Sequence, residues 1–215
     1  MTAYVPFNER RHRAHAKLLE AVGSGKRVLE LGCSSGYLAK PLSERGNTVV
    51  GVELDAEAAR EAERWCEHVI VGDVEAMTLP LSPSSFDVLL CGDVVEHLRD
   101  PTGVLARLRP LLKPAGTLVL STPNIANWAM RLSLLGGRWR YTDRGFLDRT
   151  HVHFFTRATL VETVQQAGYR VRRVDFTVPV PGDSDALDAV GRALGRLRPT
   201  LFAYQWLLIA EHTTS

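Results

Sequence analysis

The sequence is poor in cysteine and contains no long apolar segment. Its three cysteines, Cys33, Cys66 and Cys91, are odd in number and far apart, which argues against a disulfide framework and favours reduced thiols. No apolar run reaches the ~18 residues typical of a transmembrane helix. The N-terminal residues carry charges where a signal peptide has an apolar core. We therefore expect a cytoplasmic protein without a transmembrane segment.

The chain also lacks an excess of one charge. It has 26 basic and 24 acidic residues, so its net charge of +2 gives no reason to expect a nucleic-acid partner. It has no internal repeat and no low-complexity segment. Its 215 residues, 45% of them hydrophobic, are typical of one globular domain that needs no disulfides to fold.

What the chain does contain is an alternation of short apolar strands and amphipathic helices. The strands are rich in β-branched residues and leucine, which is typical of a parallel sheet covered by helices on both faces. The expected strands are residues 27–31, 48–54, 68–73, 86–93, 116–124, 169–176 and 201–211. The expected helices are residues 8–22, 36–45, 55–66, 100–116, 157–168 and 184–197, with Asp55 and Asp100 as N-caps.

This alternation breaks after the fifth strand. Residues 124–155 show no clear pattern, and the last two strands are expected to form an antiparallel pair at the sheet edge. We therefore predict a single α/β domain with a seven-stranded, mostly parallel sheet. Its parts are an N-terminal helix (1–25), a ligand-binding core (26–123), an insert or lid (124–155) and a C-terminal part (156–215).

The loop after the first strand is the first candidate binding site. In open parallel sheets, ligands lie beyond the carboxyl ends of the strands, where the strand order reverses. The glycines of the stretch Glu30–Gly36 allow close approach of a ligand to the backbone. Glu53, at the end of the second strand, can accept both hydroxyls of a ribose, and Asp73, after the third strand, can take an adenine amino group.

Two cofactors compete for such a site. A dinucleotide site prefers Gly-x-Gly-x-x-Gly, whereas this chain has Gly32-x-x-x-Gly36 without the middle glycine. Glu30, two residues before Gly32, would repel a pyrophosphate but suits a cationic ligand. S-adenosylmethionine carries a sulfonium and an ammonium group and no phosphate, so the loop favours it over NAD(P).

Five ordered segments then carry a family resemblance. "VLELGCSSG", "VVGVELD", "VGDVE", "FDVLLCGDVVEHLRDP" and "LKPAGTLVLSTPN" are similar to the class I S-adenosylmethionine-dependent methyltransferases. The branch that the chain resembles most is the ubiquinone-biosynthesis O-methyltransferases, and "HFFTRATLVETVQQAGY" extends the similarity. Ser34 departs from the family's usual glycine. The resemblance implies a Rossmann-like fold with an antiparallel last strand.

The resemblance also implies roles for individual residues. Ligands of the methionine part would be Glu30, Gly32 and Gly36, with Cys33 contributing backbone. The adenosine part would contact Glu53, Leu54, Asp73 and Val74. Cys91 would face the cofactor at the end of the fourth strand, and His97 would lie near the acceptor as a candidate base.

The stretch "DRTHVHFFT" holds two further candidate catalytic residues, His151 and His153. On a strand, both imidazoles would share one face, which would suit a metal, a structural anchor or a pocket for the acceptor. We expect no metal, because sulfonium chemistry needs none and no further ligands lie nearby in the sequence. The structural and the pocket roles both stay open.

The acceptor is expected to be a small molecule. Arginines at 131, 138, 140, 144, 149 and 157 outnumber Asp143 and Asp148 in and just after the insert, and aromatic residues interleave with them. That pattern suits a solvated face, an anionic or glycosylated acceptor, or a membrane surface.

The chain lacks the Pro-Pro-Tyr/Phe and Pro-Cys signatures of enzymes that methylate nucleic-acid bases. We expect methyl transfer to a hydroxyl or carboxyl oxygen of the acceptor by direct displacement. The alternatives are N-methylation of a small amine, an NAD(P)-dependent oxidoreductase and a catalytically silent fold.

Overall fold

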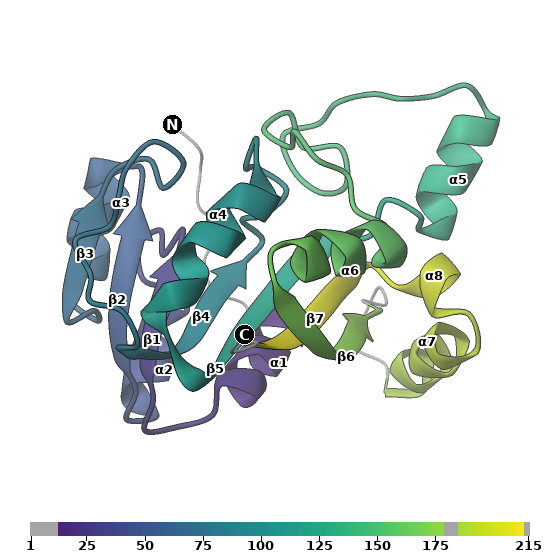
Figure 1. The fold of residues 1–215 in the computed structure, drawn as a ribbon. Coiled ribbons are helices and arrows are strands. Elements are labelled where there is room, and N and C mark those ends of the chain that lie inside the picture. The colour runs from purple at the N-terminus through teal and green to yellow at the C-terminus, as the bar shows by residue number, and fades with distance from the viewer. Residues whose placement is uncertain (1–12, 179–184, 213–215) are drawn as a thin grey trace.

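The computed structural model describes residues 13–178 and 185–212. Seven strands form one sheet in the order β3-β2-β1-β4-β5-β7-β6 (Figure 1). The order reverses between β1 and β4, which is the point where open α/β sheets bind ligands. The strands are β1 (Arg27–Leu31), β2 (Thr48–Glu53), β3 (His68–Val71), β4 (Phe86–Gly92), β5 (Leu112–Pro123), β6 (Tyr169–Thr177) and β7 (Gln205–His212).

The sheet confirms the predicted mixture of strand directions. Strands β1 to β5 pair in parallel, and β7 pairs antiparallel with both β5 and β6. β7 therefore lies inside the sheet, and β6 forms the edge. The carboxyl ends of the five parallel strands meet at one end of the sheet, together with residues 124–156.

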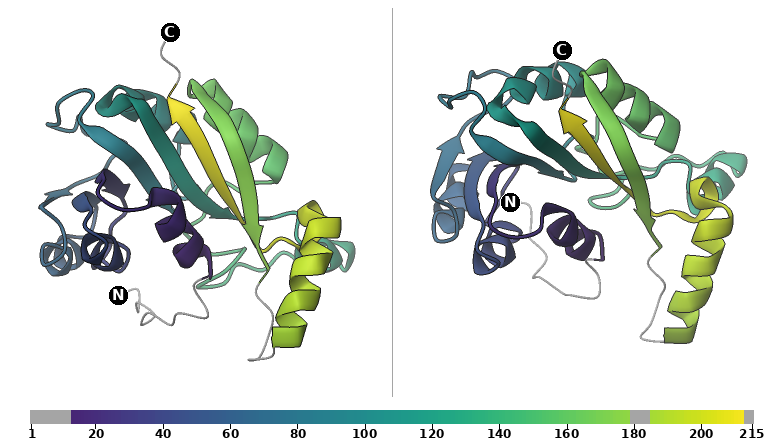
Figure 2. Two further views of the ribbon diagram at one scale, coloured as in Figure 1. Left: turned by 90° about the horizontal axis from the view of Figure 1, so that it is seen from below. Right: turned by 60° about the horizontal axis from the view of Figure 1, so that its bottom comes forward.

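Helices cover both faces of the sheet (Figure 2). Asp55 and Asp100 accept backbone hydrogen bonds at the starts of α3 and α4, as predicted, and Thr156 forms a capping box with Thr159 at the start of α6. The helices are α1 (Arg13–Val22), α2 (Ala39–Glu44), α3 (Ala56–Ala62), α4 (Pro101–Leu108), α5 (Trp128–Leu135), α6 (Arg157–Gln166), α7 (Asp185–Leu197) and α8 (Pro199–Phe202). Residues 8–12 of the expected first helix lie outside the described residues.

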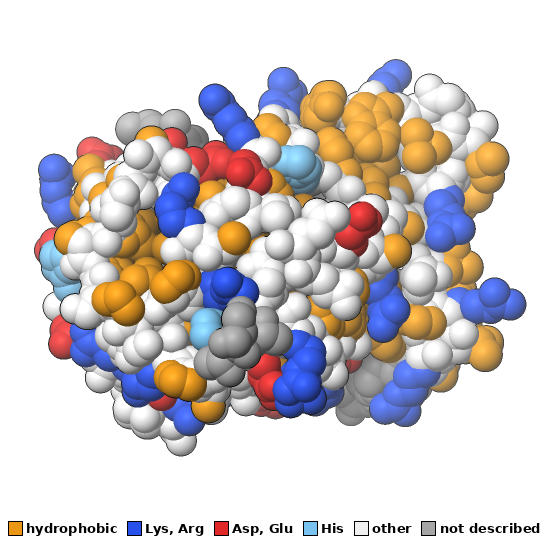
Figure 3. All heavy atoms as spheres, viewed as in Figure 1, with side chains coloured by type: hydrophobic (Ala, Val, Ile, Leu, Met, Phe, Trp, Pro, Cys, Tyr) orange, Lys and Arg blue, Asp and Glu red, His pale blue; other side chains and the backbone are white. Residues whose placement is uncertain are grey.

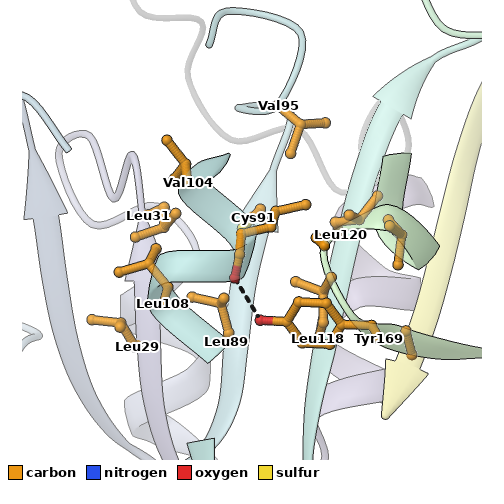
Figure 4. Packing of buried hydrophobic residues seen from close by; sticks show 14 of the residues in the cluster. Leu29, Leu31, Leu89, Cys91, Val95, Val104, Leu108, Leu118, Leu120 and Tyr169 are labelled. Atoms are coloured by element: carbon orange, nitrogen blue, oxygen red, sulfur yellow. Dashed lines mark hydrogen bonds between the residues drawn. The ribbon is translucent and has the colours of Figure 1, made fainter. Parts of the chain in front are cut away.

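Alternating side chains of the strands supply two core layers. Val28 and Leu90 point to the face covered by α1 and α2, whereas Leu29 and Leu89 point to the face covered by α4 and α6. In the second layer, shown in Figure 4, the hydroxyl of Tyr169 donates a hydrogen bond of 3.1 Å to the Leu105 carbonyl. Phe86, Phe155 and Trp206 pack with the aliphatic side chains of this layer.

Several predicted boundaries were wrong. The helix expected at 100–116 ends at Leu108, because Pro110 has no amide hydrogen to donate to the Ala106 carbonyl. A short 3-10 turn, η1 (Arg109–Leu111), leads directly into β5. The helix expected from Gly36 begins only at Ala39, and the last strand begins at Gln205 after the unpredicted α8. The insert, expected without a pattern, contains α5.

The packing of the core predicts that Leu→Ala changes the free energy of unfolding very differently at two positions. Leu118→Ala removes a fully buried side chain from β5 and should lower the free energy of unfolding by about 2–5 kcal/mol. The same change at Leu135, which is 84% exposed, should stay within about 0.5 kcal/mol. Urea unfolding followed by circular dichroism measures both. Equal losses would show that the sheet's central layer does not dominate stability.

Candidate functional site

A cavity of about 870 Å³ lies at the carboxyl ends of β1, β2, β3 and β4. Its volume falls within the range of roughly 300–1,000 Å³ that is usual for cofactor and ligand sites. The cavity is lined by Gly32, Ser34, Tyr37, Val52, Glu53, Leu54, Gly72, Asp73, Val74, Glu75, Ala76, Gly92, Asp93, Val94, His97, Leu98, Arg99 and Thr150. Six of the predicted site residues are therefore brought together: Gly32, Glu53, Leu54, Asp73, Val74 and His97.

Gly32 forms the floor of this cavity immediately after β1. Its backbone has φ +62°, and a β-carbon there would come within 2.7 Å of Val94. A larger residue would thus strain the backbone and push on the segment that follows β4. The glycine keeps the loop close to the sheet and leaves space above it.

Glu53 ties two parts of the cavity wall together. Its carboxylate accepts hydrogen bonds from the amide of Ser34 (2.7 Å) and from the amide of Asp55 (2.9 Å), and the residue is 9% exposed. Backbone amides hold the carboxylate at the cavity wall, where it can accept further hydrogen bonds from ligand hydroxyls. The ribose contact of Glu53 stays a prediction, for which this placement leaves hydrogen-bonding capacity.

Asp73 stabilises a turn and also lines the cavity. Its Oδ1 accepts a hydrogen bond of 2.8 Å from the amide of Glu75, so it organises the loop after β3. Leu54, which is 70% exposed, and Val74 also line the cavity. A flat apolar group with an amino edge would find apolar walls and one carboxylate here.

Glu30 lies beneath the cavity and does not line it. The residue is 1% exposed, and neither carboxylate oxygen has a hydrogen-bond partner within the described residues. Burial, with the nearby Cys66 and Glu53 adding to it, raises the pKa of Glu30 well above its usual value. An orphaned buried carboxyl at a ligand site is costly, and a cationic or hydrogen-bond-donating ligand would relieve that cost.

Two other residues that were predicted to bind the cofactor, Cys33 and Gly36, also lie outside the cavity lining. Cys33 is fully buried and packs against Gly51 and Cys66, and its amide donates to the Val52 carbonyl. Gly36 closes the loop with φ +84°, and a β-carbon there would lie 3.1 Å from Cα of Ala62. Both residues therefore shape the loop from behind.

Cys91 was expected to face the cofactor, and the structure places it elsewhere. Its side chain is fully buried in the apolar layer around Leu31 and Val104 (Figure 4). Alternation along β4 directs residue 91 to this layer, and the chain reaches the cavity only at Gly92 and Asp93. The sulfur thus behaves as a small apolar core group.

The charges around the cavity distinguish the candidate cofactors. Among the described residues, four carboxylates line it, from Glu53, Asp73, Glu75 and Asp93, against one arginine, Arg99. This acidic lining disfavours a pyrophosphate and suits a ligand with hydroxyl, amino and cationic groups. The described residues therefore fit S-adenosylmethionine and fit a dinucleotide poorly.

A second cavity of about 390 Å³ adjoins the first. Asp93 and His97 line both cavities, so the two spaces meet at these side chains. The other wall of the second cavity comes from the insert and from β7, including Arg144, Asp148, His151 and Gln205. A second ligand could thus lie beside the first.

Asp93 occupies the junction in a constrained backbone conformation, with φ +54°. Its carboxylate accepts hydrogen bonds from the hydroxyl of Ser121 (2.8 Å) and from the side-chain amide nitrogen Nε2 of Gln205 (2.6 Å). Sequence reasoning missed Asp93 as a site residue. The signal was present in "CGDVVEH", because the first residue beyond a central parallel strand faces the ligand end of the sheet.

The three candidate histidines divide into two groups. The rings of His97 and His151 are 4.8 Å apart, edge to face, at the second cavity. Nδ1 of each lies near a backbone carbonyl, of Thr150 at 3.2 Å and of Phe146 at 3.3 Å. A carbonyl only accepts, so each Nδ1 donates, and each Nε2 is then free to take a proton.

His153 serves a different purpose. Its Nε2 donates a hydrogen bond of 3.1 Å to the Arg99 carbonyl, and its ring stacks on Phe155. The amides of Val152 and His153 also donate to the carbonyl of Glu96. His153 therefore anchors the end of the insert to the segment after β4.

Glu96 completes the cluster around the two histidines. It is 1% exposed, its carboxylate has no hydrogen bond of normal geometry among the described residues, and burial raises its pKa well above the usual value. Burial and the neighbouring His97 lower the pKa of His151 below 6.5. Possible ligand atoms of Glu96, His97 and His151 all lie within 4.8 Å of one another. The fold thus brings together three groups that could hold a metal, although no further ligand lies near His151 and His153 in the sequence, and the expectation of no metal stays a prediction.

Comparison with known proteins identifies the family. A family model described as a methyltransferase domain matches residues 7–174. The chain belongs to the class I S-adenosylmethionine-dependent methyltransferases. It is 32% identical to a ubiquinone biosynthesis O-methyltransferase of Psychrobacter arcticus over 72% of this chain and 63% of that one. A namesake in Cereibacter sphaeroides is 32% identical over 67% of this chain, and only 60% of its length is matched.

Solved structures support the fold assignment. A methyltransferase from Archaeoglobus fulgidus superposes with a TM-score of 0.67, covering 94% of each chain at 21% identity. One from Mesorhizobium loti gives a TM-score of 0.65, covering 94% of this chain and 99% of the other at 18% identity. Both are S-adenosylmethionine-dependent, by their descriptions. The methyltransferase family thus shares the whole fold of this chain.

The geometry of the cavity predicts that one of two substitutions in its lining weakens cofactor binding more than the other. Glu53→Ala removes the carboxylate expected to bind the ribose and should weaken binding of S-adenosylhomocysteine by about tenfold to a hundredfold. Ser34→Gly keeps the amide that bonds Glu53 and should change binding by less than about threefold. Calorimetric titration measures both. Similar effects of the two changes would argue against the ribose assignment.

The buried carboxyl of Glu30 predicts a pH-dependent change in stability. Its folded-state pKa lies above 4.5, so the folded protein binds more protons than the unfolded chain, and stability falls as pH rises through that interval. Glu30→Gln removes this loss, which amounts to about 1.4 kcal/mol per pKa unit. The variant should match the wild type near pH 4 and exceed it as the pH rises above the usual glutamate pKa, in thermal melts without cofactor. If the stabilities of the variant and the wild type changed with pH in parallel, the Glu30 carboxyl would not be buried without a partner.

Proposed function

We propose that this protein transfers a methyl group from S-adenosylmethionine to an oxygen atom of a small-molecule acceptor by direct displacement. The junction of the two cavities at Asp93 and His97 carries the proposal, because a transfer reaction needs two adjoining ligand sites. The names of the curated relatives, which are O-methyltransferases, support oxygen as the acceptor atom.

The larger cavity would bind the cofactor. Glu53 would accept the ribose hydroxyls, Asp73 the adenine amino group, and Leu54 and Val74 would contact the ring. The carboxylate of Asp93 would face its cationic part. When bound, S-adenosylmethionine supplies a methyl group on a positively charged sulfur, which leaves as a neutral thioether.

The second cavity would hold the acceptor beside His97 and His151. Their free Nε2 atoms can take the proton of an acceptor hydroxyl as it attacks, and the lowered pKa keeps His151 neutral near pH 7. His153, anchored to Arg99, would hold the insert over this cavity. Pro123 and Tyr204, which line the cavity, would help to exclude water.

One titration separates the proposal from its alternatives. Calorimetry should show binding of S-adenosylhomocysteine and none of NAD, and a panel of hydroxyl and amine acceptors should then be screened with methyl-labelled cofactor. Label recovered on an oxygen supports the proposal. Binding of NAD would favour an oxidoreductase, and binding of neither ligand would favour a silent fold; either outcome would refute the proposal.

The histidines give a matched set of variants. Removing a general base typically costs about 10²–10⁴-fold in turnover, so His97→Ala and His151→Ala should each show losses of this order. Cofactor affinity should change little in His151→Ala, because His151 does not line the larger cavity. His153→Ala should retain more activity, because its role is positional. Turnover should fall on the acid side with an apparent pKa below 6.5, as expected for His151.

A chelation control distinguishes a base from a metal ligand. Treatment with EDTA should leave turnover unchanged if the histidines act only as bases. Loss of activity that Mg²⁺ or Zn²⁺ restores would instead assign Glu96, His97 and His151 to a cation and would contradict the role proposed for them.

A further inference from the structure

The insert presents apolar side chains to solvent on one face of the molecule. Leu132, Leu134 and Leu135 of α5 are 59%, 50% and 84% exposed, and Trp128 at its start is 49% exposed. Trp139 and Tyr141 follow in the next loop, at 38% and 51%. We call these six residues and the exposed arginines at 131, 138 and 140 the insert patch. In Figure 3, side chains of both kinds gather at the upper right, over the insert.

The fold holds this patch in place. The side chain of Asn127 caps α5 through the amide of Ala129, and it also donates a hydrogen bond of 2.8 Å to the Ala203 carbonyl. After the helix, the Ser133 hydroxyl and the Arg138 amide close a turn between residues 133 and 138. Trp139 packs edge to face on Phe154 at 5.2 Å. The apolar side chains are therefore exposed on an ordered element.

The charges of the patch have one sign. Residues 124–142 contain three arginines and no aspartate or glutamate, and the next acid, Asp143, forms an ion pair of 3.0 Å with Arg149. Arginines interleaved with tryptophan, tyrosine and leucine match the two layers of a bilayer surface, which are anionic headgroups and the acyl boundary below. A second copy docked by this patch would instead oppose arginine to arginine.

We propose that the insert patch docks the protein onto the surface of a bilayer that contains anionic phospholipids. Within the described residues, no helix combines the length and the apolar character needed to cross a membrane. The leucines of α5 insert beneath the headgroups, and the three arginines bind phosphates. The proposal does not depend on the reaction that the cavities perform.

Vesicle sedimentation of the full chain tests this proposal. Vesicles of equal parts phosphatidylglycerol and phosphatidylcholine should bind the protein at least about tenfold more tightly than phosphatidylcholine alone. The variant L132E/L135E should lose at least about tenfold in affinity for the mixed vesicles. Changing both residues leaves the core untouched, and a thermal melt confirms folding.

Matched controls separate the patch from general hydrophobicity. Leu197→Glu makes the same change at a leucine that is 74% exposed outside the patch, on α7, and should bind like the wild type. Arg138→Gln with Arg140→Gln should weaken the preference for phosphatidylglycerol and its dependence on salt.

Three results would overturn the proposal. The first is no binding to either vesicle, and the second is an equal loss in Leu197→Glu. The third is a concentration-dependent dimer in sedimentation velocity that L132E/L135E abolishes, because it would assign the patch to a second copy of the chain.

Discussion

The site depends on the carboxylate of Glu53. By accepting hydrogen bonds from the amides of Ser34 and Asp55, it fixes the first loop to the end of β2 and to the start of α3. The same oxygens border the larger cavity, so the contact that shapes the wall also leaves capacity for a ligand. The rest of the cavity, from Gly32 to Asp73, is arranged around this fixed point.

Two acidic residues, one on each side of the cavity junction, are buried without a hydrogen-bond partner among the described residues, which is unusual in a folded protein. Glu30 below the cofactor cavity and Glu96 beside the histidines are both buried, with raised pKa values. Such groups cost folding free energy unless a partner arrives. The two apolar layers of the sheet supply the folding free energy that offsets this cost. The two acids lie at two adjoining cavities, a position that suits a protein that brings a cofactor and an acceptor together.

Much of the fold could be predicted because its signals are local. Strand patterns and the N-caps Asp55 and Asp100 lie in short runs of sequence, and they were confirmed. The meeting of Glu96 with His151 could not be predicted, because 54 intervening residues fold back over the sheet. Cys91 was misplaced because a strand-end residue can face either the core or the ligand, and only the register decides. α5 was missed because most of its apolar residues face solvent, so the helix lacks the core-facing apolar stripe by which a helix is recognised in a sequence.

A crystal structure of the protein with S-adenosylhomocysteine tests the central claim most directly. The account predicts that the adenosine part occupies the larger cavity, with its ribose hydroxyls within hydrogen-bond distance of Glu53 and its purine beside Asp73 and Leu54. Adenosine density outside this cavity, or a ribose that makes no contact with Glu53, would contradict it.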